Sequence, residues 1–170
     1  MMTATDRGER GTGLTELIIL VPLLLVCMLG AFDLGRLIHA HQTMTDMTRE
    51  AGNLVSRGST IDQTFDAAFL SSGTLDVTSV GGIITSEVRR RSTDDPTPWI
   101  FQQERRGALS GIASKVGTSD GPARIPNIAA IPAGVTIMAV ETMYPFDPAF
   151  DLASLGLSFY PEVLYDAAFF

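Results

Sequence analysis

The residues best suited to chemistry begin with a single acid at the edge of an apolar run. Glu16 directly precedes Leu17–Phe32, a stretch without any charged side chain. An unpaired charge in hydrocarbon is costly, so acids at that depth tend to have a partner and a function. The alternative is an acid in the first turn of a helix, where the helix dipole favours negative charge. We favour the functional interpretation of Glu16.

A polar cluster follows the apolar run, where a membrane-spanning helix would meet the outer surface. Asp33 and Arg36 are three residues apart and can pair on one helix face. His39 and His41 are the only histidines, and residues two apart on a helix point to different faces. They therefore lack the i, i+4 spacing with which two histidines chelate a metal. We interpret the four residues as a membrane-boundary polar cluster and expect no metal.

Arginines gather at Arg89, Arg90 and Arg91, with Arg105 and Arg106 as a second group. A solvated strand end is the default interpretation, and a docking patch for acidic partners at Arg89–Arg91 is the alternative.

Composition restricts the other function classes. The net charge of −7 argues against nucleic acid, which attracts clustered positive charge. Cys27 is the only cysteine, so the chain cannot form an internal disulfide or a thiolate metal site. No nucleophile, base and metal set suggests a catalytic pocket. We expect no enzymatic activity and no cofactor, and the alternative of an anchored hydrolase requires a polar pocket within 58–170.

The N-terminal segment could be a cleaved secretory signal, a lipoprotein signal or an uncleaved membrane anchor. A cleaved secretory signal would place Leu29 at a position that favours small residues, and a lipoprotein signal would place Val26 before Cys27, so both fit poorly. An uncleaved anchor is the plain interpretation, because the run is close to the ~20 residues that span a bilayer. Arg7 and Arg10 precede the run and favour a cytoplasmic N-terminus.

One long helix is predicted over 12–57, with its transmembrane part at about 14–32. Pro22 and Gly30 soften this helix, and Pro22 favours a kink because it lacks an N–H group. Gly58 is the predicted C-cap. The outer half is amphipathic and needs an apolar cover. Its apolar stripe consists of Leu34, Leu37, Ile38, Met44, Met47, Ala51 and Leu54.

The predicted elements beyond this helix are a short helix at 61–72, strands at 74–80 and 82–91 joined as a hairpin at Gly81-Gly82, a strand at 99–106, a loop at 107–134 and a strand at 135–146. The tail from residue 151 is apolar enough to pack or to form an interface. We therefore predict an α+β fold, pilin-like in outline, in which a small antiparallel sheet domain (58–170) packs on the outer half of the long N-terminal helix.

Several of these residues together resemble a known family. The segment RGTGLTELIILVPLLLVCMLGAFDLGR is similar to the TadE/TadF-like minor pilins, or pseudopilins, of tight-adherence (Flp) type IV pilus systems. The resemblance extends over about 8–58 and 117–150. The residues that carry its N-terminal part are Gly11, Glu16, Pro22, Gly30, Gly35 and Arg36.

The resemblance implies a maturation step and a role for the acid. A prepilin peptidase would cut between Gly11 and Thr12, which removes residues 1–11 as a leader. Glu16 would then be the fifth residue and would pair with the amine of Thr12, on its own chain or on a neighbouring subunit.

The family also implies a function and partners. The protein would help to initiate, prime or cap a pilus, with other pilins, the peptidase, the inner-membrane assembly platform and membrane lipid as partners. It would cross the bacterial inner membrane once, with the C-terminal domain in the periplasm, or enter the extracellular pilus. The runner-up is an uncleaved single-span envelope scaffold or sensor.

Overall fold

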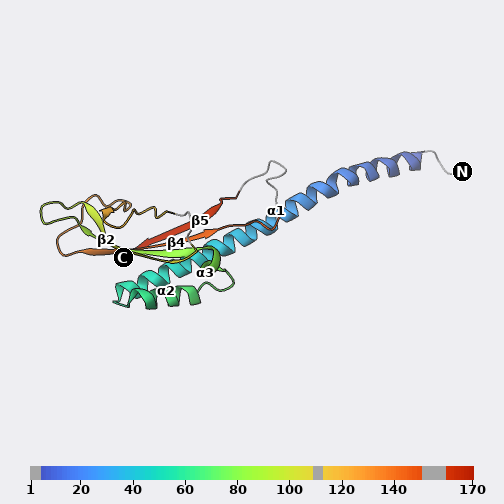
Figure 1. Ribbon diagram of the computed structural model, residues 1–170. Coiled ribbons are helices and arrows are strands. Elements are labelled where there is room, and N and C mark those ends of the chain that lie inside the picture. The colour runs from blue at the N-terminus through green and yellow to red at the C-terminus, as the bar shows by residue number, and fades with distance from the viewer. Residues whose placement is uncertain (1–4, 109–112, 151–159) are drawn as a thin grey trace. The chain divides into compact units, whose positions relative to one another are not determined.

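The computed structural model describes residues 5–108, 113–150 and 160–170, with side chains from residue 13 onward (Figure 1). The chain divides into two compact units, Met1–Ile38 with Pro148–Tyr160, and His39–Asp147 with Pro161–Phe170. The helices are α1 (Thr5–Ser56), α2 (Ile61–Leu70) and α3 (Val77–Val80). The strands are β1 (Gly82–Arg90), β2 (Pro98–Gly107), β3 (Gly121–Pro122), β4 (Thr136–Pro145) and β5 (Val163–Phe169).

The first unit contains the apolar half of α1. The helix continues through Pro22, which lies inside it. Glycine at Gly30 and Gly35 does not interrupt it either. The kink at Pro22 stays a prediction.

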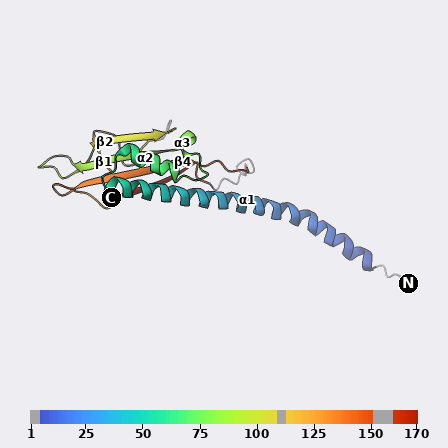
Figure 2. The same ribbon diagram turned by 90° about the horizontal axis from the view of Figure 1, so that it is seen from below.

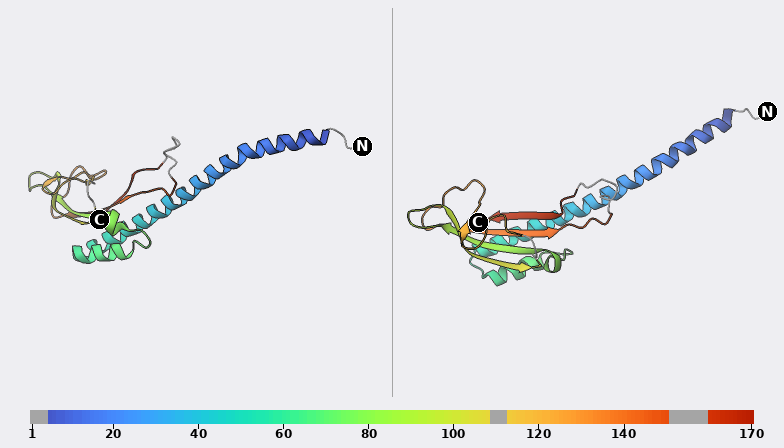
Figure 3. Two further views of the ribbon diagram at one scale, coloured as in Figure 1. Left: turned by 45° about the vertical axis from the view of Figure 1, so that its right-hand side comes forward. Right: turned by 45° about the horizontal axis from the view of Figure 1, so that its top comes forward.

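The second unit is built on one antiparallel sheet with the strand order β3-β2-β1-β4-β5. In the centre, β1 pairs with β2 on one side and with β4 on the other, so that Ile84 lies opposite both Arg105 and Glu141. On its other side β4 pairs with β5, which forms one edge of the sheet. Figure 3 shows these two strands side by side. The predicted α+β class is confirmed.

Helices cover one face of this sheet (Figure 2). Successive side chains of a strand point to opposite faces, so Val140 and Ala139 of β4 belong to different cores. The core on the helix side consists of Met47, Ala51, Phe65, Ala68, Val77, Ile83 and Val140. The predicted apolar stripe is thus confirmed for its outer part, whereas Leu34 and Ile38 are exposed.

The long segment between β2 and β4 covers the opposite face. Its buried side chains Val116, Ile125 and Ile131 pack with Val88, Ile100 and Ala139 of the sheet. Residues 109–112 of the predicted 107–134 loop lie outside the described residues. In the remainder the chain is mostly irregular, with the two-residue strand β3 as its regular element.

The predicted strand at 74–80 and the hairpin at Gly81-Gly82 are wrong. Residues 77–80 form α3, because the Asp76 side chain accepts a hydrogen bond from the Ser79 amide and caps the turn. The true hairpin joins β1 to β2, and Gly82 lies opposite Gly107 at its open end. The alternation of polar and apolar residues over 74–80 is compatible with a short strand. The hydrogen bond from the Ser79 amide to the Asp76 side chain favours a helical turn instead, and alternation alone does not reveal it.

Two helix boundaries follow directly from sequence signals. Gly58 has a φ of +84° and ends α1, as predicted. The amide of Ser59 donates to the Leu54 carbonyl and that of Gly58 to the Val55 carbonyl, which is a Schellman motif. Thr60 then begins α2 with a capping box shared with Gln63.

Candidate functional site

The most unusual surface of the protein is the exposed apolar part of α1. Its most apolar 18-residue window has a mean hydropathy of 2.6 and is only 6% buried. Ile19 and Met28 are 73% and 75% exposed. A helix that is apolar on all sides belongs in a membrane or among other apolar helices. This helix is long and apolar enough to cross a membrane.

Glu16 lies on this surface and is exposed to solvent. It lines an open groove of about 480 Å³ on the helix, between Gly13 and Leu23. The carboxylate therefore belongs to a surface that is otherwise lined by apolar side chains. Gly11 and Thr12 have helical backbone one turn earlier, and their side chains lie outside the described residues.

At the other end of the apolar run, Asp33 is completely buried. Its two carboxylate oxygens accept hydrogen bonds from the backbone amides of Ala149, at 2.8 Å, and Phe150, at 3.0 Å. Arg36 Nη1 lies 3.4 Å from Asp33 Oδ1, so the two residues pair as their spacing suggested. The amide contacts join segments 116 residues apart, and no local sequence signal could have found them.

Aromatic side chains make two further contacts in this part of the first unit. The rings of Phe32 and Phe150 meet edge to face, with centroids 5.9 Å apart. The Tyr160 hydroxyl donates a hydrogen bond of 3.0 Å to the Gly30 carbonyl. We define the collar as these contact residues of the first unit: Gly30, Phe32, Asp33, Ala149, Phe150 and Tyr160.

The two histidines of the predicted boundary cluster make local contacts within α1. His41 Nδ1 lies 3.5 Å from Thr45 Oγ1, and the His39 carbonyl accepts a bond from Thr43. Both side chains are exposed. Among the described residues, no group of three or more His, Cys, Asp or Glu side chains is arranged to hold a metal ion.

The arginines of the proposed docking patch are engaged within their own hairpin. Arg89 pairs with Glu87. Arg90 donates to the carbonyls of Ser92 and Thr93. Arg91 lies 3.5 Å from Asp95 and stacks over the Trp99 ring at 4.6 Å. These three arginines thus stabilise the β1–β2 hairpin. Arg89 and Arg90 also line an open cavity of about 540 Å³.

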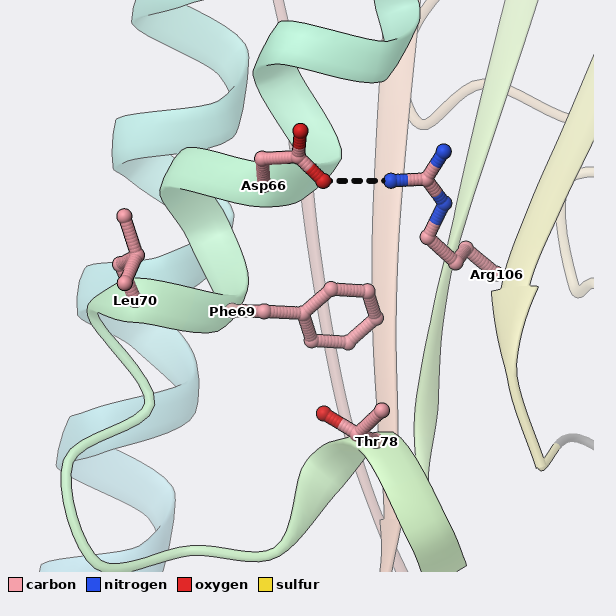
Figure 4. A pocket seen from close by; sticks show the side chains of 5 residues that line it. All are labelled: Asp66, Phe69, Leu70, Thr78 and Arg106. Atoms are coloured by element: carbon pink, nitrogen blue, oxygen red, sulfur yellow. Dashed lines mark hydrogen bonds and ion pairs between the residues drawn. The ribbon is translucent and has the colours of Figure 1, made fainter.

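Arg106 of the second basic group joins β2 to α2. Its guanidinium pairs with Asp62 and, at 2.6 Å, with Asp66. It also lies 5.2 Å from the centre of the Phe65 ring. Figure 4 shows the Asp66 pair at the rim of a groove of about 500 Å³. The two acids offset the positive charge of Arg106 at this groove.

A second buried carboxylate lies in the sheet. Glu141 of β4 is completely buried. It accepts hydrogen bonds from the amides of Lys115 and Val116, from the Ser114 hydroxyl and, at 2.9 Å, from Tyr165 Oη. The only sequence signal for this network was an acid in the middle of the predicted 135–146 strand. The four donors make Glu141 an anchor for the segment that covers the sheet.

The comparisons with known proteins point to the N-terminal helix. Residues 11–53 match the family model described as TadE-like protein. This match covers the exposed apolar run, the collar residues of α1 and the buried stripe, and it confirms the N-terminal part of the resemblance noted in the sequence. The resemblance over 117–150 stays a prediction. No curated protein and no solved structure matches the chain significantly.

Proposed function

Because its N-terminal helix is TadE-like, we propose that this chain is a minor pilin of a tight-adherence pilus and helps to initiate, prime or cap it. Assembly rather than catalysis is its proposed activity. The observation that carries the proposal is the apolar surface of α1, whose most apolar window is only 6% buried among the described residues. Lipid would cover this apolar surface in the membrane, and the helices of other pilins would cover it in a pilus.

Glu16 has a defined part in this assembly. Cleavage after Gly11 would leave a free amine on Thr12, four residues before the carboxylate. Between neighbouring helices the carboxylate and an amine would lie in a medium of low dielectric constant, where their attraction is strong. The pair would fix the axial register of adjacent subunits. The protein would cross the bacterial inner membrane once and present its second unit to the periplasm.

The maturation step is tested by mass spectrometry of the full chain, co-expressed with the prepilin peptidase of its own pilus system. We expect a mature N-terminus at Thr12. Gly11→Val should block the cut, because a branched side chain replaces the glycine at the cleavage site. Gly13→Val is the matched control and should be processed. An intact leader in the wild-type chain, with active peptidase present, would favour the uncleaved envelope scaffold.

The register role is tested by in vivo cross-linking to the major pilin of the same system. Glu16→Gln removes a charged hydrogen-bond partner worth about 1.5–3 kcal/mol, so the cross-linked yield should fall about tenfold or more. Glu50→Gln changes an exposed acid further along α1 and is the control. Equal yields for both variants would contradict the role of Glu16.

A further inference from the structure

We propose that the collar is a lipid-contacting ring that lies in the headgroup layer of the bilayer and fixes how deeply α1 is inserted. The inference builds on the proposed membrane-spanning role of α1 and adds a second segment, distant in sequence, to the membrane contact. The collar would contact phospholipid headgroups on the periplasmic side of the membrane. Four observations within the first unit support it.

The position of the collar along α1 matches the edge of a bilayer. At 1.5 Å per residue, the helix from Leu14 to Phe32 is about 28 Å long. The hydrocarbon core of a bilayer is about 30 Å thick. If Leu14 lies near one edge of the hydrocarbon, Phe32 and Asp33 therefore lie near the other.

The chemistry of the collar changes from apolar to polar in the same direction. Phe32 is 57% exposed and continues the apolar surface of the span. The Phe150 ring contacts it edge to face, and the Tyr160 hydroxyl binds Gly30 two residues earlier. Aromatic side chains are typical of the membrane–water boundary. One turn further on, Arg36 is 44% exposed, in a position to meet lipid phosphates.

The burial of Asp33 explains how a carboxylate can occupy this depth. A bare carboxylate at the hydrocarbon edge would be costly. Here two backbone amides and Arg36 satisfy it. The same two hydrogen bonds attach Ala149 and Phe150 to the helix, so the acid acts as a positioning residue for the aromatic ring of Phe150.

The Tyr160 hydroxyl provides the second attachment point. It binds the Gly30 carbonyl, less than one turn before Asp33. The contacts of Ala149, Phe150 and Tyr160 with α1 therefore all lie between Gly30 and Asp33. This is the depth at which the helix would leave the hydrocarbon.

The proposal is tested by tryptophan fluorescence of the full chain in liposomes of phosphatidylcholine and phosphatidylglycerol. Trp99 is the only tryptophan, so a Trp99→Phe background leaves each introduced tryptophan as the sole reporter. The variants are Phe150→Trp in the collar, Leu23→Trp in the middle of the span and Phe101→Trp on the sheet. The lipids carry bromine either near the headgroups or near the chain ends.

We expect Phe150→Trp to be quenched at least twofold more by the shallow bromines than by the deep ones. Leu23→Trp should show the opposite order, and Phe101→Trp should respond to neither. If Phe150→Trp behaves like Phe101→Trp while Leu23→Trp is quenched, the collar proposal fails and the spanning helix stands. If Leu23→Trp is not quenched either, the membrane-spanning role itself fails.

The positioning role of Asp33 has its own readout. In the Phe150→Trp background, Asp33→Asn should reduce shallow quenching at least twofold, because an amide has one oxygen with which to accept the two amide bonds. Asp46→Asn, an exposed acid on the same helix, is the control and should leave quenching unchanged. Unchanged quenching in Asp33→Asn would show that this acid does not position the ring.

Discussion

At the scale of single residues, two buried carboxylates hold distant segments in place, one in each unit. Asp33 binds two backbone amides of the segment after β4, and Glu141 binds two amides of the segment that covers the sheet. A carboxylate that accepts bonds from backbone amides gains charge-assisted hydrogen bonds, which are about twice as strong as neutral ones. Each acid thus stabilises irregular chain that has no strand or helix pattern of its own.

Tyr165 lies beside Glu141 and makes the second unit sensitive to alkaline pH. Its partial burial, followed by the negative charges of Glu141 and Asp166, raises the pKa of Tyr165 above its ordinary value. Lys115 Nζ lies 3.9 Å from the centre of the same ring and is the neighbouring positive charge. The phenol therefore stays protonated in the folded protein at a pH where an unfolded chain would ionise it.

We expect the free energy of unfolding to fall as the pH rises above about 10, the ordinary pKa of tyrosine. Below that pH the protonated phenol contributes fully to the stability of the fold. This contribution is lost as the pH rises from the pKa of the unfolded chain towards the higher pKa of the folded protein. Tyr165→Phe should cost about 1 kcal/mol near neutral pH through the lost hydrogen bond, and its stability should fall less between about pH 9 and pH 11. Urea unfolding of the full chain in detergent, followed by Trp99 fluorescence, measures both. Parallel pH curves for the two proteins would contradict the assignment.

At the scale of elements, a glycine of α1 leaves room for the aromatic ring that follows β5. A Cβ atom on Gly52 would lie 1.7 Å from the Phe170 ring. Phe170 exchanges two backbone hydrogen bonds with Met138 of β4, which holds the end of the chain against the sheet. The absence of a side chain at Gly52 therefore allows the helix and the end of β5 to pack closely.

Gly52→Ala should destabilise the second unit by about 1–3 kcal/mol through overpacking, although alanine is the better helix former. Asn53→Ala, an exposed neighbour on the same helix, should be neutral or slightly stabilising. Urea unfolding of the full chain measures both variants. In a double-mutant cycle Phe170→Ala should relieve much of the cost of Gly52→Ala, and additive effects would show that the two residues do not interact.

At the scale of the whole molecule, α1 serves the two units in different ways. Up to Ile38 its apolar side chains are mostly exposed, and from Ala40 onward an apolar stripe is buried in the core of the second unit. The stripe residues Met44, Met47 and Ala51 are at most 1% exposed. The helix is thus an anchor in one unit and a core element in the other.

A chain that begins at His39 should therefore fold without the apolar run, whereas one that begins at Gly58 should not. Loss of a large buried apolar side chain costs about 2–5 kcal/mol, and domains are stable by only about 5–15 kcal/mol. Removal of the whole stripe should thus abolish cooperative folding. Cooperative thermal unfolding of the shorter chain, measured by circular dichroism, would show that α1 is dispensable for the core.

The sequence by itself determined the features that depend on neighbouring residues. These include the apolar run, the stripe at Met44, Met47 and Ala51, the end of α1 at Gly58 and three of the five strands. Each follows from local periodicity or from a cap signal, which short-range backbone energetics dictate. The TadE-like segment is equally local, since it is one continuous helix.

Only the tertiary structure decided which segments the buried acids hold. The amides bound to Asp33 and Glu141 lie up to 117 residues away, and β5 becomes a strand because β4 offers it an edge. Such contacts depend on the packing of distant segments, which leaves no pattern in the local sequence. The space at Gly52 was decided in the same way, by the position of Phe170. The α3 turn is different, because its capping bond joins Asp76 to Ser79 and is therefore local.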